Sequence, residues 1–204
     1  MLKTLNQTAV GLALVAALTA GALVIPATAA AEEVKKANAS VRTVQVHHHT
    51  IDLPVPYDKL TSNIEKMLGR FDPVDTYIAI TERQRGTERL QASQGEEGLM
   101  LFSSNDHGVL WALLGEKPRK AIRYYLGNPL FAIRMTQKNL GAALYAPLTV
   151  VVYQIDANTT RVEYDQPSTL FGQFSEPAID QVGKALDLKL RNLIFRAAGL
   201  PTDL

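Results

Sequence analysis

The spacing of hydrophobic and polar residues changes several times along the chain, and each change predicts a new element. Apolar residues recur at every second position over residues 42–51, where β-branched side chains are frequent, so this stretch predicts a strand. Residues 56–70 instead place Tyr57, Leu60 and Ile64 at helical spacing. That stretch therefore predicts an amphipathic helix.

The middle of the chain combines short apolar runs with polar stretches. The runs at 74–80 and 99–105 predict a second and a third strand. Residues 81–98 between them are polar and contain three glycines, which predicts a loop or a poorly packed helix. Residues 106–116 predict a short helix with Asp106 near its N-cap.

The second half of the chain gives clearer patterns. Residues 120–129 predict a strand that is closed by a Gly-Asn-Pro turn, and residues 130–146 have a helical pattern. Residues 147–156 and 161–166 predict two strands joined by a short turn. Because this hairpin has no crossover helix, at least part of the sheet must be antiparallel.

The clearest helix pattern covers residues 175–201, where Ser175 is expected to act as the cap and Gly199 to end the helix. "PSTLFGQF", residues 167–174, predicts an irregular loop before it. The element order favours an α+β fold over a doubly wound one. We therefore expect a two-layer sandwich with a mainly antiparallel sheet and helices packed on one face.

The first 31 residues are typical of a secretory signal peptide. Lys3 precedes a long apolar run, and small residues at Ala29 and Ala31 form an A-x-A-like end. Cleavage is expected after Ala31, with Ala29 as the alternative, and no stable membrane span would then remain. The competing interpretation is an uncleaved anchor, because the run approaches the length needed to cross a bilayer.

After the signal peptide, residues 32–40 are expected to form a flexible leader and residues 41–204 a single domain. The expected location is the periplasm or the exterior. Once Lys3 is removed, basic and acidic side chains balance, so no global basic field favours nucleic acid. The chain contains no cysteine, which excludes disulfides, thiol catalysis and thiolate metal sites.

Three consecutive histidines, His47, His48 and His49, are the most conspicuous candidate chemistry. In a strand His47 and His49 share one face, and such an H-x-H pair can supply half of a zinc or copper site. If Val46 faces the core, His48 points inward and the other two point outward. Ile51 argues for the opposite orientation, and two exposed histidines without metal are the simpler alternative.

His107 follows Asp106 at a predicted strand-to-helix junction, where polar side chains often form sites. A carboxylate beside an imidazole can raise its basicity, as a general base requires. Ser103 and Ser104 are candidate nucleophiles only by proximity. The structural alternative is that Asp106 caps the helix. Residues 117–123 are rich in Lys and Arg, which suits either a solvated edge or contact with an anionic lipid or phosphate.

Several segments together resemble the bacterial domain-of-unknown-function family 302, over about residues 56–198. They are "NDHG", "YYLGNPLFAIRMT", "AALYAPLTVVVYQ", "TRVEYDQPSTLFGQF" and "ALDLKLRNLI". The resemblance implies a compact α+β domain with a helix-covered sheet. It implies no particular reaction, substrate or cofactor, and the histidine run lies outside these segments.

Four residues in or beside these segments are candidate ligand contacts: Asn128, Tyr145, Tyr164 and Phe171. Three functions stay open. The first is a periplasmic binding or accessory protein, whose partner is a small molecule or another periplasmic protein. The second is a small hydrolase or isomerase that uses His107 and Asp106, and the third is a copper or zinc protein that uses His47 and His49. No sequence motif identifies a cofactor.

Overall fold

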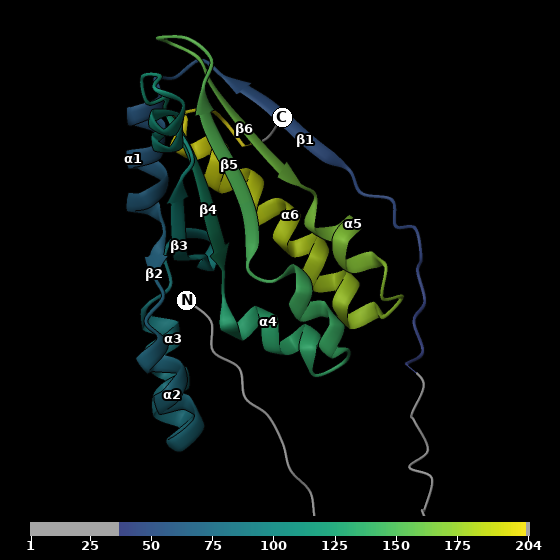
Figure 1. Cartoon of the computed structure of the whole chain (residues 1–204). Coiled ribbons are helices and arrows are strands. Elements are labelled where there is room, and N and C mark those ends of the chain that lie inside the picture. The colour runs from purple at the N-terminus through teal and green to yellow at the C-terminus, as the bar shows by residue number, and fades with distance from the viewer. Residues whose placement is uncertain (1–36, 203–204) are drawn as a thin grey trace, which may run out of the picture. The chain divides into compact units, whose positions relative to one another are not determined.

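Six strands form one sheet in the order β1–β6–β5–β4–β3–β2 (Figure 1). The computed structural model describes residues 37–202, so the expected signal peptide and most of the leader lie outside the described residues. All neighbouring strands are antiparallel except β2 and β3. The strands are β1 His48–Leu53, β2 Gly69–Arg70, β3 Met100–Asp106, β4 Ala121–Gly127, β5 Leu148–Gln154 and β6 Thr160–Asp165.

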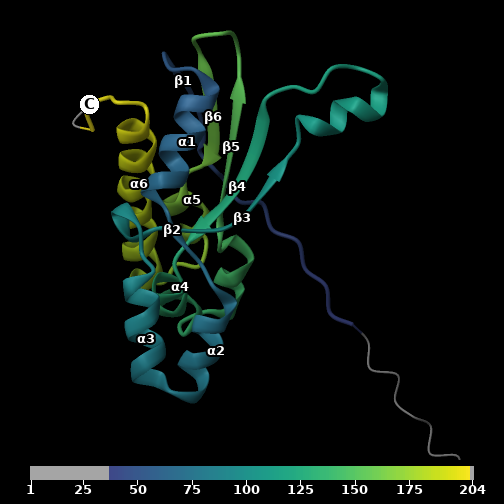
Figure 2. The ribbon, with the colours of Figure 1, turned by 90° about the vertical axis from the view of Figure 1, so that its left-hand side faces the viewer.

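Helices cover one face of this sheet, and Figure 2 shows the long helix α6 on that side. The α-helices are α1 Tyr57–Met67, α2 Pro73–Thr81, α3 Arg83–Ala92, α4 Pro129–Thr136, α5 Pro167–Gly172 and α6 Pro177–Ala197. Three short 3₁₀ helices are η1 Glu96–Gly98, η2 Val109–Leu114 and η3 Leu140–Tyr145. The expected α+β sandwich with a mainly antiparallel sheet is confirmed. All these elements lie in one compact unit, Arg42–Leu204.

Alternation along the strands places the core between the sheet and the helices. On β5, Val150 and Val152 are buried, whereas Val151 between them is only half-buried on the opposite face. From α6, residues such as Leu190 and Ile194 meet this apolar surface. Burial of these side chains supplies the main stabilisation of the fold.

The prediction of a strand at 74–80 is wrong, because this segment is helix α2. Asp72 accepts a hydrogen bond from the Val74 amide and Pro73 occupies the first turn, and both features start helices. Asp75 then binds Arg89 of α3 at 2.6 Å. The cap and this contact between helices outweigh the strand preference of the valine, tyrosine and isoleucines.

Three further expectations need correction. The first strand begins at His48, six residues later than expected from the alternation. Residues 167–172 form helix α5 and not an irregular loop, since Pro167 opens a turn that buries Phe171 against α6. Ser175 has a φ of 50° and does not cap α6, whose N-cap position is held by Glu176.

Candidate functional site: an apolar cavity beside α4

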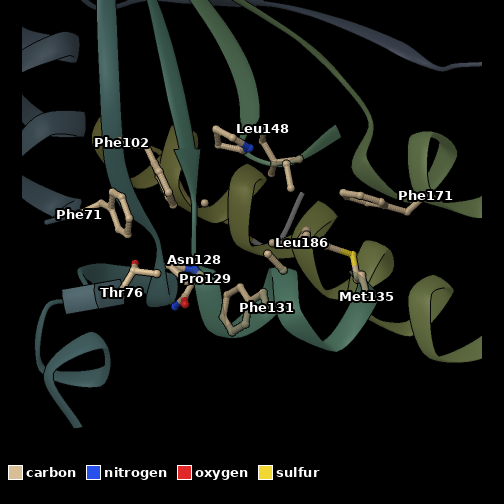
Figure 3. Close-up of a pocket in the computed structure, with 14 residues that line it drawn as sticks. Phe71, Thr76, Phe102, Asn128, Pro129, Phe131, Met135, Leu148, Phe171 and Leu186 are labelled. Atoms are coloured by element: carbon tan, nitrogen blue, oxygen red, sulfur yellow. The ribbon is translucent and has the colours of Figure 1, made fainter. Parts of the chain in front are cut away.

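An apolar cavity of about 250 Å³ lies where β4 ends and α4 begins (Figure 3). Side chains from β3, α2, α4, α5 and α6 converge on it. The cavity is lined by Phe71, Thr76, Phe102, Gly127, Asn128, Pro129, Phe131, Ala132, Met135, Ala146, Pro147, Leu148, Phe171 and Leu186. None of these side chains carries a charge.

The Gly127-Asn128-Pro129 turn positions the floor of the cavity. Pro129 has the fixed φ that suits the first turn of a helix, and Oδ1 of Asn128 accepts a hydrogen bond from the Leu130 amide at 2.8 Å. Nδ2 of Asn128 donates to the carbonyl oxygen of Gly98 at 2.7 Å. Both polar atoms of the Asn128 side chain therefore bond to backbone groups. Its role in the cavity is to hold the start of α4 in place.

Aromatic rings form much of the wall. Phe71 and Phe102 stack with ring centroids 4.2 Å apart, and Figure 3 shows both rings on the same side of the cavity. Phe171 is fully buried and Met135 nearly so, whereas Phe131 is only partly buried. This combination gives a cavity with a buried interior and a partly accessible rim.

One polar atom in the cavity is left without a partner. Oγ1 of Thr76 is buried, and within residues 37–202 no group hydrogen-bonds to it. A buried hydroxyl without a partner is costly, because it has lost its hydrogen bonds to water. The lining therefore presents an almost entirely apolar surface, with the unpartnered hydroxyl of Thr76 buried in its wall.

The four predicted ligand contacts divide between two hollows. Asn128 and Phe171 line the apolar cavity, whereas Tyr145 and Tyr164 line a second hollow of about 310 Å³. That second hollow lies against the open face of the sheet and also contains Arg123, Glu163, Asp165 and His48. Its charged lining contrasts with the neutral lining of the cavity beside α4.

Both tyrosines are held by aromatic contacts. Tyr145 meets Phe171 and Phe174 edge-on, with centroids 6.4 and 6.2 Å apart. Tyr164 stacks on His49 with the centroids 4.9 Å apart, and burial raises the pKa of its hydroxyl. These contacts account for both rings without a ligand.

The first and third histidines of the run bind the same atom. Nδ1 of His47 and Nε2 of His49 both lie 3.2 Å from Oε1 of Gln166. Nε2 of Gln166 in turn donates to Asp187 of α6 at 3.0 Å. The pair thus ties the start of β1 to the end of β6. Over residues 37–202 no three His, Asp or Glu side chains are grouped to hold a metal ion, so the copper or zinc hypothesis has no third ligand.

The middle histidine points away from the core, contrary to the expectation based on Val46. His48 is exposed on the open face, while His49, Ile51 and Leu53 are directed toward the covered face. Nδ1 of His48 lies 2.8 Å from Asp165, and this hydrogen bond is the main reason that the pKa of the imidazole is raised. The strand therefore has the orientation that Ile51 indicated, with Ile51 facing the core and His48 facing outward.

The candidate catalytic pair lies apart from both hollows. His107 is exposed at the end of β3, and Oδ1 of Asp106 accepts a hydrogen bond from the Val109 amide at 3.1 Å. Ser103 and Ser104 are exposed as well. Asp106 thus has the capping role that was the structural alternative, and neither hollow includes His107 among its lining residues.

Comparison with known proteins identifies the family. Residues 84–196, more than half of the chain, match the family described as "Domain of unknown function DUF302". The chain belongs to this family. A crystal structure of an uncharacterised conserved DUF302 protein from Bacillus stearothermophilus matches with a TM-score of 0.52 and 20% identity, covering 74% of this chain and 97% of the other. No curated protein matches.

The likeness to that crystal structure shows a shared fold, and the cavity residues belong to this chain's own structure. Within residues 37–202 of the present protein, no helix is both long enough and apolar enough to cross a membrane. Sequence reasoning missed Thr76, Phe71 and Phe102 as cavity residues. Thr76 was assigned to a strand, and the spacing of the other two along the chain gives no signal that their rings meet.

Proposed function

We propose that this DUF302 protein is an exported binding protein whose cavity beside α4 holds a small, neutral, mainly hydrocarbon ligand with one hydrogen-bonding group. The observation that carries this proposal is the lining of the cavity. Apolar side chains surround it, no charge faces it, and Oγ1 of Thr76 is buried without a partner among the described residues.

The volume limits the size of the ligand. An engineered cavity of about 150 Å³ accepts benzene, whereas pockets for drug-sized ligands begin at about 300 Å³. The volume of about 250 Å³ lies between these values. A ligand with a short alkyl chain or one substituted ring fits this range.

The lining also limits the charge of the ligand. A carboxylate or ammonium group taken into an apolar cavity loses its hydration and gains no ion pair here. A neutral hydroxyl or carbonyl loses less hydration, and it can pair with Oγ1 of Thr76 once rotation of that side chain turns the buried oxygen toward the ligand. The site should therefore prefer an alcohol to a carboxylate of the same length.

Binding can be tested with octan-1-ol and octanoate as a matched pair, by calorimetric titration of the chain that begins at Glu32. The expected result is binding of the alcohol and at least tenfold weaker binding of the carboxylate. Ala132→Phe fills part of the cavity and should abolish binding, while circular dichroism checks that the variant is folded. Equal binding of octanoate, or full binding by folded Ala132→Phe, would contradict the proposal.

The role of the hydroxyl can be tested separately with Thr76→Val. Loss of one hydrogen bond should weaken octan-1-ol binding by a factor of about three to ten. Binding of ethylbenzene, which has no polar group, should not change. Thr149→Val in the second hollow is the matched control and should leave both affinities as they are.

Export depends on the first 31 residues and has its own test. The full chain is expressed in a bacterial host, and the mass of the periplasmic product is measured. A product that begins at Glu32, or at Ala30 for the alternative cleavage, supports export. Intact chain found only in the cytosol would rule export out and leave the ligand proposal standing.

A further inference from the structure

The segment between β3 and β4 has no role in the proposed binding site. We name residues 107–120 the β3–β4 tip. Figure 2 shows it extending away from the sheet and carrying a short helix at its end. That helix is η2, Val109–Leu114, and it contains the only tryptophan of the chain, Trp111.

The end of the tip exposes an apolar surface. Leu113 and Leu114 are 83% and 72% exposed, and about half of the surface of Val109 and of Leu110 is exposed as well. Residues three apart lie on the same side of a 3₁₀ helix, so Leu110 and Leu113 form one apolar stripe. A cluster of large apolar side chains at a projecting end is unusual on a soluble surface and indicates an interaction site.

The tip is held firmly at its base. The amides of His107 and Gly108 both donate to the carbonyl oxygen of Ala121, and the Arg119 amide donates to the carbonyl oxygen of Gly108 at 3.1 Å. A Cβ atom at residue 108 would lie 1.7 Å from the carbonyl oxygen of Arg119, so only glycine allows this close approach. The segment that carries the exposed leucines is therefore anchored to the sheet by backbone hydrogen bonds at its base.

Basic groups flank the apolar end. Lys117, Arg119 and Lys120 lie in the tip, against a single acidic residue, Glu116. The guanidinium of Arg119 stacks over the Trp111 ring at 3.6 Å, and Lys120 pairs with Asp58 of α1. Exposed apolar side chains, a tryptophan and several cations within one short projecting segment form a combination that suits the surface of an anionic bilayer.

We propose that the β3–β4 tip docks the protein on anionic membranes, with Leu110, Leu113 and Leu114 entering the acyl boundary and Lys117 and Arg119 contacting the headgroups. A second copy of the chain is the alternative occupant. A stable protein interface takes about 20–30 residues from each partner, which a six-residue helix on a projecting end does not provide. A bilayer needs no complementary hollow, and the basic flank matches its charge.

The test measures binding to vesicles of phosphatidylcholine alone and of equal parts phosphatidylcholine and phosphatidylglycerol. The chain used begins at Glu32, so that the apolar amino-terminal run cannot bind lipid, and it retains the whole compact unit Arg42–Leu204. Trp111 supplies the signal, because its emission shifts to the blue when the ring enters the interface. The expected result is co-sedimentation and a blue shift with the anionic vesicles only, both weakened by added salt.

The matched variants are Leu113→Ser/Leu114→Ser in the tip and Leu140→Ser/Leu144→Ser in η3, where the leucines are 82% and 80% exposed. The tip variant should lose at least tenfold in vesicle affinity, since burial of one leucine side chain alone changes binding by about that factor. The η3 variant should bind as the parent does.

Three results would overturn the proposal: no binding to anionic vesicles, equal loss of binding in both double variants, or a blue shift of Trp111 that needs no lipid and follows protein concentration. The last result would assign the tip to self-association, which sedimentation equilibrium measures directly. The membrane proposal does not depend on the ligand cavity, because all the substitutions lie outside its lining.

Discussion

The two faces of the sheet are built from alternate residues of the same strands, yet their chemistry differs completely. The covered face presents Val150, Val152 and Val162 to the helices, all of them buried. On the open face the positions on either side of Val162 carry charge, and one of them, Arg161, binds Asp52 through two hydrogen bonds of 2.6 and 2.8 Å. Alternate side chains of one strand therefore point into the core and toward the solvent.

Two polar side chains on the covered face have specific partners. The hydroxyl of Tyr124 donates to Glu65 of α1 at 2.9 Å, and Oγ1 of Thr160 donates to the carbonyl oxygen of Val55 at 2.7 Å. Burial and this hydrogen bond raise the pKa of Tyr124 far above its usual range. The comparison indicates that packing on the covered face sets stability, whereas exposed pairs on the open face contribute little.

The sharpest test of this contrast uses two leucines of α6. Leu190 is fully buried against the sheet, and Leu188 is 62% exposed. Leu190→Ala should lower the free energy of unfolding by about 3–4 kcal/mol, because it leaves a cavity, whereas Leu188→Ala should change it by less than about 0.5 kcal/mol. Urea denaturation measures both values. Similar losses in the two variants would mean that α6 is not packed as described.

A second pair compares the faces within one strand. Val152→Ala removes buried methyl groups from the covered face and should cost about 2 kcal/mol, whereas Val151→Ala on the open face should cost well under 1 kcal/mol. The two substitutions are chemically identical and adjacent, so strand propensity cancels. If the order of the two losses is reversed, the assignment of the faces is wrong.

Gln166 connects the edge strand β1 to the end of β6, because His47 and His49 both contact its side chain. Gln166→Ala should lower the free energy of unfolding by about 1–2 kcal/mol, because several half-buried polar groups lose their partner. Gln154→Ala at the far end of β5 is the control and should change it by less than about 0.5 kcal/mol. A neutral effect of Gln166→Ala would show that the histidine contacts add nothing to stability.

The smallest effect concerns pH on the open face. Because Asp165 raises the pKa of His48, the folded state binds that proton more tightly than the unfolded state does. The resulting stabilisation is complete below about pH 6.5 and is lost as the pH rises through the raised pKa. His48→Gln should therefore flatten the decline in melting temperature between pH 6 and 8, and Asp165→Asn should do the same.

Asp52→Asn is the control for that measurement. Its hydrogen bond to Arg161 lowers the pKa of Asp52, so the related stabilisation is lost only as the pH falls below about 4. Between pH 6 and 8 this variant should shift the melting temperature without changing its slope. A slope that is the same in all variants would exclude His48 as the titrating group.

Sequence patterns predicted most of the fold: β5, β6, α1 and α6 each bury one regular stripe, and β3 and β4 follow from short apolar runs. It failed at α2, where a valine, a tyrosine and isoleucines suggested a strand although the cap at Asp72 and the contact of Asp75 with Arg89 fix a helix. It also failed at α5. These segments are short, and tertiary contacts decide between their alternatives.

The candidate site was only partly predictable. Asn128 and Phe171 could be named because a Gly-Asn-Pro turn and an aromatic residue stand out in the sequence. Thr76 could not be recognised, because its importance depends on helix α2, which places the residue in the cavity wall and buries Oγ1. Phe71 and Phe102 are 31 positions apart by number, and only the pairing of β2 with β3 brings their rings together.

The position of β1 at the edge of the sheet affects the order in which the molecule can assemble. Its ladder runs entirely along β6, from His48 opposite Asp165 to Leu53 opposite Thr160. Within residues 37–202 the first strand to be synthesised must therefore wait for the last, and a high share of such distant pairings slows folding. If the proposed export takes place, this late pairing would keep the chain unfolded for longer before translocation.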